Sequence, residues 1–290
     1  MSFKVDGWIR RLVCSAAPLA IALGACTRLP PEIEPKPGPT GHTSPAAEMK
    51  AERDLATATR LPPPPLLSVP PEVVTHGPRN EKRIALTFDA CSTRDVSQYD
   101  ELVTRTLIAT HTPATIFLGG RWAVEEAAHV KELAANPLFE LVNHSYTHPH
   151  MAAIVDEVRI RRELQRTQAE IHRLTGKTPK FFRPPYGEYN ERLVRIAAEL
   201  GLTTVEYDLA SGDPDVHATK ERLVHWVLQK AQPGSIVVMH INHLRFHTAE
   251  ALPAIISGLR ARGFELVTVG ELIRVQRVDR AEGISQVKKP

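Results

Sequence analysis

Short apolar, β-branched segments alternate with segments of helical periodicity between residues 84 and 267. Apolar runs of four to eight residues that are rich in Val, Ile, Thr and Phe are typical of buried strands. Apolar positions three and four residues apart, separated by polar ones, predict amphipathic helices. The pattern predicts strands at 84–88, 115–118, 139–142, 180–182, 203–207, 235–239 and 264–267, and helices at 122–135, 155–174, 191–200, 220–230 and 248–262.

The order of these elements indicates an α/β fold. Seven strands that alternate with helices are typical of parallel βα units, in which each helix crosses over to the next strand. Gly201 and Gly263 follow two of the predicted helices, at the positions where a helix ends and the chain turns toward a strand. Both an open doubly wound sheet and a closed barrel fit this alternation.

The first residues have the character of an export signal. Residues 1–11 are basic, residues 12–25 are apolar or small, and Cys26 follows directly. Such an order is typical of a secretory signal, and the apolar run is too short to span a bilayer. The ending Leu23-Gly24-Ala25-Cys26 resembles a bacterial lipobox. We expect residues 1–26 to be a lipoprotein-type signal peptide with Cys26 as the lipidation site; a plain cleaved signal or an uncleaved anchor is the alternative.

A proline-rich stretch follows this signal. Thirteen of the 24 prolines lie between residues 27 and 80, including four in a row at 62–65. Because proline fixes φ and removes a hydrogen-bond donor, such a stretch does not build helices or central strands. We expect residues 27–80 to be a disordered, extended tether, either as a spacer from the membrane or as a leader without that role. The folded domain is then 81–275, and residues 276–290 form a C-terminal tail.

Composition and charge narrow the classes of partner. The chain has 290 residues and a net charge of +3, and no stripe of Lys and Arg interleaved with aromatic residues. Nucleic acid is therefore excluded as a partner, and no apolar run is long enough for a polytopic membrane protein.

Of the three cysteines, Cys14 lies in the signal and Cys26 is the expected anchor, so the folded part contains only Cys91 and no internal disulfide. We expect a monomer, held at the membrane by its lipid in the cell envelope; an outer-membrane position facing the periplasm is one option.

Residues capable of chemistry gather where the predicted strands end. In both barrels and open α/β sheets, sites form at the carboxyl ends of the strands. Five different strands are followed by charged or imidazole side chains, which indicates one site rather than scattered surface residues. These residues are Asp89, His144, His148, Arg183, Asp208, Asp213 and His240.

The residue types suggest a metal-assisted hydrolase. His144 and His148, four residues apart in a loop after a strand, are suited to Zn²⁺ or a similar divalent ion. With a carboxylate such as Asp89 and a separate His240, the site would have a metal, a base and an acid. Each residue also has a structural reading: a surface or core histidine, a helix N-cap for Asp89, and a buried hydrogen-bonding residue for His240. No Gly-x-Ser-x-Gly, Cys-x-x-Cys or Gly-x-Gly-x-x-Gly motif is present.

The motifs together resemble those of the polysaccharide deacetylases, the NodB-homology group of carbohydrate esterase family 4, over residues 80–275. The segments that carry the resemblance are Thr87-Phe88-Asp89-Ala90, His144-Ser145-Tyr146-Thr147-His148, Arg183-Pro184-Pro185-Tyr186-Gly187, Ser211-Gly212-Asp213-Pro214 and the apolar strand that ends in His240. The second, third and fifth match the family pattern. The first has alanine for its second aspartate, and the fourth lacks the usual tryptophan.

The resemblance implies a distorted (β/α)7 barrel with a divalent metal, Zn²⁺ or Co²⁺. It implies that Asp89 is the general base and His240 the general acid, that His144 and His148 bind the metal, and that Arg183 and Asp213 orient the two catalytic groups. Pro185 and Tyr186 of the third motif are the expected substrate contacts. The implied reaction removes N-acetyl groups from amino sugars in peptidoglycan, chitin-like chains or related glycans, so a glycan polymer is the expected partner.

The alanine at position 90 leaves the metal site open to three interpretations. The family's second aspartate is its third metal ligand, and catalytic zinc sites use three protein ligands. Asp89 could be a ligand itself, or Cys91 or Asp95 could supply the third ligand from the following loop. Alternatively, the site binds little metal, and the protein is a catalytically impaired, glycan-binding lipoprotein on the same fold.

Overall fold

The computed structural model describes residues 69–93 and 96–273. The expected signal peptide, Cys26, most of the expected tether, Asp95 and the C-terminal tail lie outside the described residues. The strands are β1 (Val73–Val74), β2 (Arg83–Ala90), β3 (Ala114–Leu118), β4 (Phe139–Asn143), β5 (Phe181–Phe182), β6 (Thr203–Val205), β7 (Leu209–Ala210), β8 (Ile236–His240) and β9 (Glu265–Val267). The α-helices are α2 (Glu101–Ala109), α3 (Gly120–Glu125), α4 (Ala127–Ala135), α5 (Glu157–Thr175), α6 (Glu191–Glu199), α7 (Lys220–Lys230) and α8 (Thr248–Ala261).

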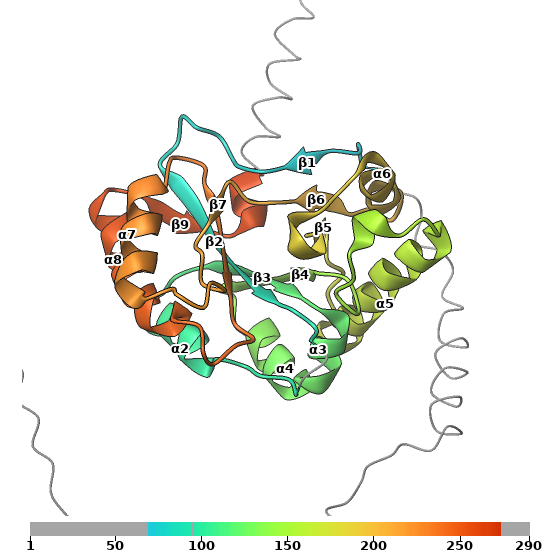
Figure 1. Ribbon diagram of the computed structural model, residues 1–290, viewed down its shortest axis with the longest axis horizontal. Helices are drawn as coiled ribbons and strands as arrows, with labels where there is room; N and C mark the ends of the chain where they lie inside the picture. Colours follow the sequence, from blue (N-terminus) through green and yellow to red (C-terminus); the bar gives the residue numbers. More distant parts are fainter. Residues whose placement is uncertain (1–68, 94–95, 274–290) are drawn as a thin grey trace, which may run out of the picture. The chain divides into compact units, whose positions relative to one another are not determined.

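The strands form one parallel sheet that curls into an incomplete barrel. Their order is β1-β6-β5-β4-β3-β2-β8-β7, and β9 pairs with the first residues of β2. The β1 end of this order approaches β8, the strand next to the other end, because His76, just after β1, forms an antiparallel bridge with Ser235, just before β8. The helices lie around the sheet, with α7 and α8 on one side and α5 and α6 on the other (Figure 1). The predicted distorted (β/α)7 barrel is confirmed, and the doubly wound alternative is wrong.

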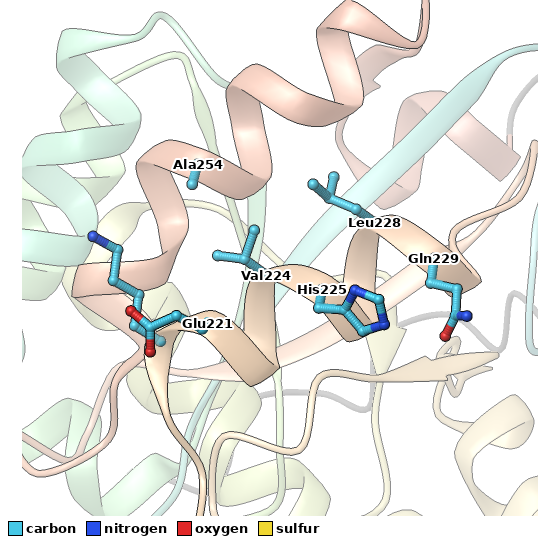
Figure 2. A pocket seen from close by; sticks show the side chains of 7 residues that line it. Glu221, Val224, His225, Leu228, Gln229 and Ala254 are labelled. Carbon is cyan, nitrogen blue, oxygen red and sulfur yellow. The ribbon is translucent and has the colours of Figure 1, made fainter.

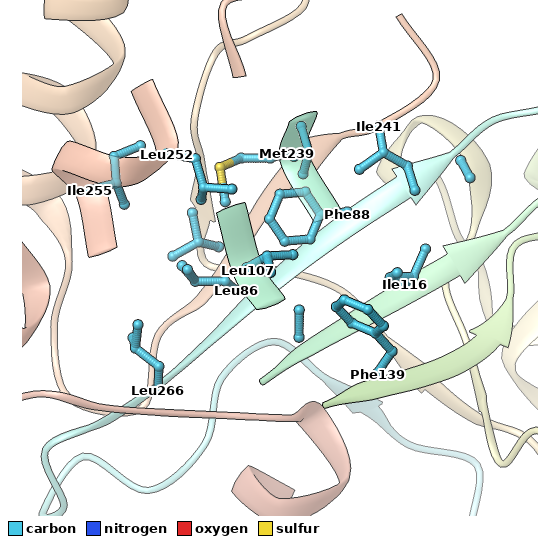
Figure 3. Packing of buried hydrophobic residues seen from close by; sticks show 14 of the residues in the cluster. Leu86, Phe88, Leu107, Ile116, Phe139, Met239, Ile241, Leu252, Ile255 and Leu266 are labelled. Carbon is cyan, nitrogen blue, oxygen red and sulfur yellow. The ribbon is translucent and has the colours of Figure 1, made fainter. Parts of the chain in front are cut away.

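Alternation along β2 separates an outer core from the interior of the barrel. Side chains in a strand point alternately to the two faces of its sheet. Ile84, Leu86, Phe88 and Ala90 belong to one buried apolar cluster with residues of α2 and α8, and Figure 3 shows Leu86 and Phe88 facing Leu107 and Leu252. Ala85 belongs to a second cluster inside the barrel. Thr87 and Asp89 follow it on this inner face, which brings a buried carboxyl group to the end of the strand.

All seven predicted strands are present. The structure differs from the prediction in two helices and in two short strands at the ends of the sheet. The predicted helix at 122–135 is two helices, α3 and α4, which are divided at Glu126. Helix α2 was not predicted, because its apolar residues alternate with threonines and other β-branched residues that lower helix propensity. The Asp100 side chain accepts a hydrogen bond from the Leu102 backbone N–H and caps this helix. Strands β1 and β7 contain two residues each, too few to produce a periodic pattern.

Candidate functional site

The end of β2 supplies two polar side chains to the mouth of the barrel. Asp89 is 5% exposed, and the Arg183 guanidinium donates to its Oδ1 from Nη1 at 2.7 Å. Cys91, two residues further along the chain, has its Sγ 3.6 Å from Nε2 of His144. Because Ala90 points into the outer apolar cluster, the residue that faces the site after Asp89 is Cys91.

The loop after β4 positions the two predicted metal ligands. Asn143 accepts a hydrogen bond from the Ser145 backbone N–H. Glu163 of α5 accepts from the backbone N–H groups of Tyr146 and Thr147 and from the Thr147 hydroxyl. Ser145 and His148 have left-handed backbone conformations, with φ of 61° and 56°. Such conformations are costly in residues other than glycine, and the Glu163 carboxylate holds the loop between these two residues in place.

The hydrogen bonds of His144 orient its ring toward the site. Its Nδ1 lies 2.9 Å from the backbone carbonyl oxygen of Arg183, which only accepts, so Nδ1 carries the proton. On the opposite side of the ring, Nε2 faces Cys91 and Asp89, whose Oδ2 lies 3.7 Å away. Burial lowers the pKa of His144, but the Asp89 charge and the contact with Cys91 outweigh it and raise the pKa above its ordinary value. A histidine metal ligand is usually fixed in this way by a second hydrogen bond on the opposite ring nitrogen. Asp89 and His144 thus share one support, because the Arg183 side chain binds the first and its carbonyl the second.

Cys91, His144 and His148 form a group that fits a divalent metal ion. One ligand atom from each of these three side chains lies within 4.8 Å of the other two. A thiolate and two imidazoles are the donor types that suit zinc. Burial raises the pKa of the Cys91 thiol, but contacts with His144, His148 and His240 outweigh it and hold the pKa well below its ordinary value. The chain therefore has three candidate ligands despite the alanine at position 90.

His240, the last residue of β8, is held by a buried carboxylate. Asp213 is 2% exposed, and its Oδ1 accepts from Nδ1 of His240 at 3.0 Å. The same carboxylate accepts from the His240 backbone N–H and from the hydroxyl groups of Ser211 and Thr248. Burial lowers the pKa of His240, but the Asp213 charge and hydrogen bond outweigh it and raise the pKa well above the ordinary value. The imidazole is thus charged and holds a proton on Nε2.

The buried Arg183 controls the charge of Asp89. Its Nη1 also donates to the Thr87 hydroxyl, and its guanidinium carbon lies 3.8 Å from the centre of the Phe117 ring, inside the barrel. Burial raises the pKa of Asp89, but the charges of Arg183, His144 and His240 together hold it below the ordinary value. Asp89 is therefore a carboxylate, with Oδ1 bound to Arg183 and Oδ2 directed toward His144.

The third motif also contributes an exposed ring beside the metal group. Pro185 is buried, whereas Tyr186 is 54% exposed and has a φ of 62°. The Tyr186 ring lies 4.6 Å from the ring of His148 and stacks on the ring of His150 at 4.0 Å. The two predicted substrate contacts therefore differ, since only Tyr186 presents its side chain to solvent.

One predicted strand-end residue lies away from this group, and one residue was missed. Asp208 accepts from the backbone N–H of Ile236, at the start of β8, and pairs with Arg79. Glu206, directly after β6, is 5% exposed, and its Oε1 has no hydrogen-bond partner within the described part of the chain. Burial raises the pKa of Glu206 to about 7, although the nearby Arg183 lowers it. The residues on either side of Glu206 in the sequence did not indicate that its side chain is buried near Arg183.

Replacing Glu206 with glutamine should alter how stability depends on pH. In the wild type the folded state keeps its proton up to about pH 7, whereas an unfolded chain releases it near 4.3. Stability therefore falls as the pH rises through this window, by about 4 kcal/mol at most. Urea unfolding at pH 5 and pH 8 gives the change in the free energy of unfolding between these two pH values. This free energy should fall less in Glu206→Gln than in wild type. Glu132→Gln, at an exposed position on α4, is the control, and an equal decline in Glu206→Gln and wild type would contradict the assignment.

A surface hollow of about 610 Å³ lies elsewhere, between α7 and α8 (Figure 2). It is lined by Lys220, Glu221, Val224, His225, Leu228, Gln229 and Ala254, none of which is a predicted site residue. Its lining comes from helices rather than from strand ends, so it does not compete with the site at the mouth of the barrel. Within residues 69–93 and 96–273, no helix is both long and apolar enough to cross a membrane.

Comparison with known proteins links this geometry to a family. The family model described as polysaccharide deacetylase matches residues 76–205. A peptidoglycan-N-acetylglucosamine deacetylase from Bacillus cereus is 30% identical over 204 residues, which cover 69% of this chain and 72% of that protein. That relative is a hydrolase of a carbon–nitrogen bond.

The solved structures that resemble this chain include a pseudoenzyme. A wild-type pseudoenzyme of carbohydrate esterase family 4 from Bacillus anthracis has a TM-score of 0.63 and 29% identity, covering 70% of this chain and 69% of that one. A mutant of that pseudoenzyme, described as having restored enzymatic activity, has a TM-score of 0.63 and 31% identity, covering 70% and 72%. Motifs, fold and relatives agree: this chain belongs to the polysaccharide deacetylase family, carbohydrate esterase family 4.

Proposed function

We propose that the protein is a metal-dependent hydrolase that removes N-acetyl groups from an amino-sugar polysaccharide of the bacterial envelope. The observation that carries this proposal is the placement of a carboxylate, Asp89, and a protonated imidazole, His240, around the Cys91–His144–His148 group. Amide hydrolysis needs a base for the attacking water and an acid for the leaving amine. The family relatives named as peptidoglycan deacetylases support an acetylated glycan as the substrate.

The chain's own residues account for both proton transfers. A divalent ion bound by Cys91, His144 and His148 would supply an activated water and Lewis-acid polarisation of the acetamide carbonyl. Asp89 has one carboxylate oxygen bound to Arg183 and the other directed toward His144, so the second is the one that accepts the proton of the attacking water. His240 donates its Nε2 proton to the leaving nitrogen, because its Nδ1 is held by Asp213.

Acetate release tests this proposal. We expect the full-length protein, supplied with Zn²⁺ or Co²⁺, to release acetate from acetylated glucosamine oligomers or from peptidoglycan. EDTA should abolish the release, added metal should restore it, and His148→Ala should lower it by at least about 100-fold, because loss of a partner of a metal ligand alone costs 10- to 100-fold. No acetate release from several oligomers and peptidoglycan with either metal would contradict the proposal.

A glycan-binding protein without turnover is the second candidate. The similarity to a wild-type pseudoenzyme of the family favours it, as does the alanine that stands at the family's third ligand position. This candidate predicts that glycan pull-down is unaffected by chelator and that no acetate is released. A turnover that EDTA or Asp89→Asn abolishes would exclude it.

The envelope location is also part of the proposal. It rests on the lipobox-like end of the signal and on Cys26 as the lipid attachment site, with the proline-rich stretch as a spacer. An acetylated wall polymer lies outside the cytoplasm, so export agrees with the proposed substrate. A lipid anchor would make the membrane the second partner of this protein.

A further inference from the structure

The loop between β8 and α8 places an aromatic pair directly beside the proposed general acid. The ring of Phe246 lies 5.7 Å from the ring of His240 at an interplanar angle of 81°. The Phe246 ring also lies 4.4 Å from the ring of its other neighbour, His243, at an interplanar angle of 38°. Phe246 and His243 are half-buried, and Leu244 between them is 62% exposed. An apolar surface open to solvent thus adjoins the position at which the leaving amine receives its proton.

Hydrogen bonds fix this loop to the segment that carries the base and the thiol. The Asn242 side chain donates to the backbone carbonyl of Cys91 at 3.0 Å, and the Ile241 backbone N–H donates to the carbonyl of Asp89 at 3.2 Å. The Leu244 N–H donates to the Gln98 side chain. The aromatic pair is therefore held in a set position relative to the reacting groups, and a ligand that contacts it pays little for ordering the loop.

An exposed ring, Tyr186, and a half-buried ring, Phe246, contact different histidines of the site. On one side, Tyr186 contacts His148 and stacks on His150. On the other, Phe246 contacts His240 and His243. Cys91 connects the two sides: its Sγ lies within 4.8 Å of a ring nitrogen of His148, and its backbone carbonyl accepts from the Asn242 side chain in the β8–α8 loop. A single acetylated sugar at the centre would leave the outer rings without a partner, whereas a chain of sugars would meet both.

We propose that Phe246, supported by His243, forms a subsite for the pyranose ring that neighbours the acetylated one. One face of a pyranose ring presents C–H groups, and an aromatic ring is the side chain that packs against such a face. The fourth motif has Pro214 in the place of an aromatic residue, so the β8–α8 loop provides the apolar wall near Asp213 and His240. This inference rests on the proposed function, since it assigns the glycan an orientation at that site.

The test compares oligomer length with the residue at position 246. We expect Phe246→Leu to raise KM about tenfold for acetylated glucosamine tetramers and pentamers, with kcat unchanged, because an aromatic contact contributes about 1.4 kcal/mol, a factor of ten. For the N-acetylglucosamine monomer, which occupies only the central position and does not reach the subsite, kcat/KM should stay within about twofold of wild type. Phe246→Tyr keeps the ring and should keep the wild-type length dependence.

A second measurement separates this subsite from the catalytic proposal. Binding of the pentamer and the monomer to the full-length protein in EDTA, measured by calorimetry, needs no turnover. Weaker pentamer binding in Phe246→Leu than in wild type supports the subsite even if no acetate is released. Equal effects on monomer and pentamer, or no effect on either, would overturn it. Trp226→Leu, which removes a 43% exposed ring from α7, is the control and should match wild type at every length.

Discussion

Replacing Cys91 with alanine should remove both bound zinc and deacetylase activity from the protein. Cys91 supplies the third candidate ligand atom beside His144 and His148, and two imidazoles alone do not complete a catalytic zinc site. We expect the zinc content after dialysis to fall from about one ion per chain to near zero, and kcat/KM to fall by more than about 100-fold. Metal analysis and acetate release on the same preparations provide the measurement.

Two further substitutions sharpen this result. Cys91→Asp keeps an ionised ligand on the inner face of the strand and should retain metal, with a shift away from zinc toward harder ions. Ala90→Asp, which restores the family's residue, should not replace the thiol, because Ala90 lies in the outer apolar cluster with no exposed surface. A carboxyl group there should destabilise the fold by about 1–3 kcal/mol. Full metal content in Cys91→Ala would contradict the ligand assignment.

Replacing His240 with asparagine should slow amide hydrolysis by about 10²- to 10⁴-fold, mainly in kcat. The reason is that the protonated ring, held by Asp213, is the donor for the leaving amine. An ester with a good leaving group, such as 4-nitrophenyl acetate, departs without a proton. Its hydrolysis by His240→Asn should therefore stay within about tenfold of the wild-type rate, an allowance for the altered ring contacts.

Asp89→Asn distinguishes the acid from the base in the same assays. A base for the attacking water is needed for both substrates, so Asp89→Asn should slow the amide and the ester alike. His225→Asn, on α7 away from the strand ends, is the control for a histidine replacement and should behave as wild type. Equal losses on amide and ester in His240→Asn would show that His240 does not act as the acid.

The sequence was sufficient for the fold class and for most of the residues that meet at the site. Buried parallel strands have continuous apolar runs, and polar residues after such runs have to come together at one end of a barrel. Asp89, His144, Arg183 and His240 follow from that rule, and the rule was wrong for Asp208, which turns to the start of β8. Residue type alone could not distinguish Asp208 from the residues that do meet at the site, because the direction of the short loop after β6 depends on tertiary contacts.

Other features depend on contacts between distant segments. The choice between Asp89, Cys91 and Asp95 as third ligand depended on which face of β2 each side chain occupies. Ala90 in the outer cluster and Cys91 beside His144 favour the thiol. Glu206 and Phe246 acquire their environment from Arg183 and His240, which lie 23 and six residues away along the chain. The pattern of apolar and polar residues around Glu206 and Phe246 does not reveal such contacts.

Arg183 supports two groups of the site through different parts of the residue, so its replacement would not affect them equally. Its side chain holds Asp89 and its carbonyl holds His144, so substitution of this residue would disturb a catalytic group while leaving the backbone support of a ligand in place. The backbone contact is available to any residue type, whereas the guanidinium contact is not. Replacement of Arg183 should therefore impair the carboxylate of Asp89 more than it impairs the orientation of His144.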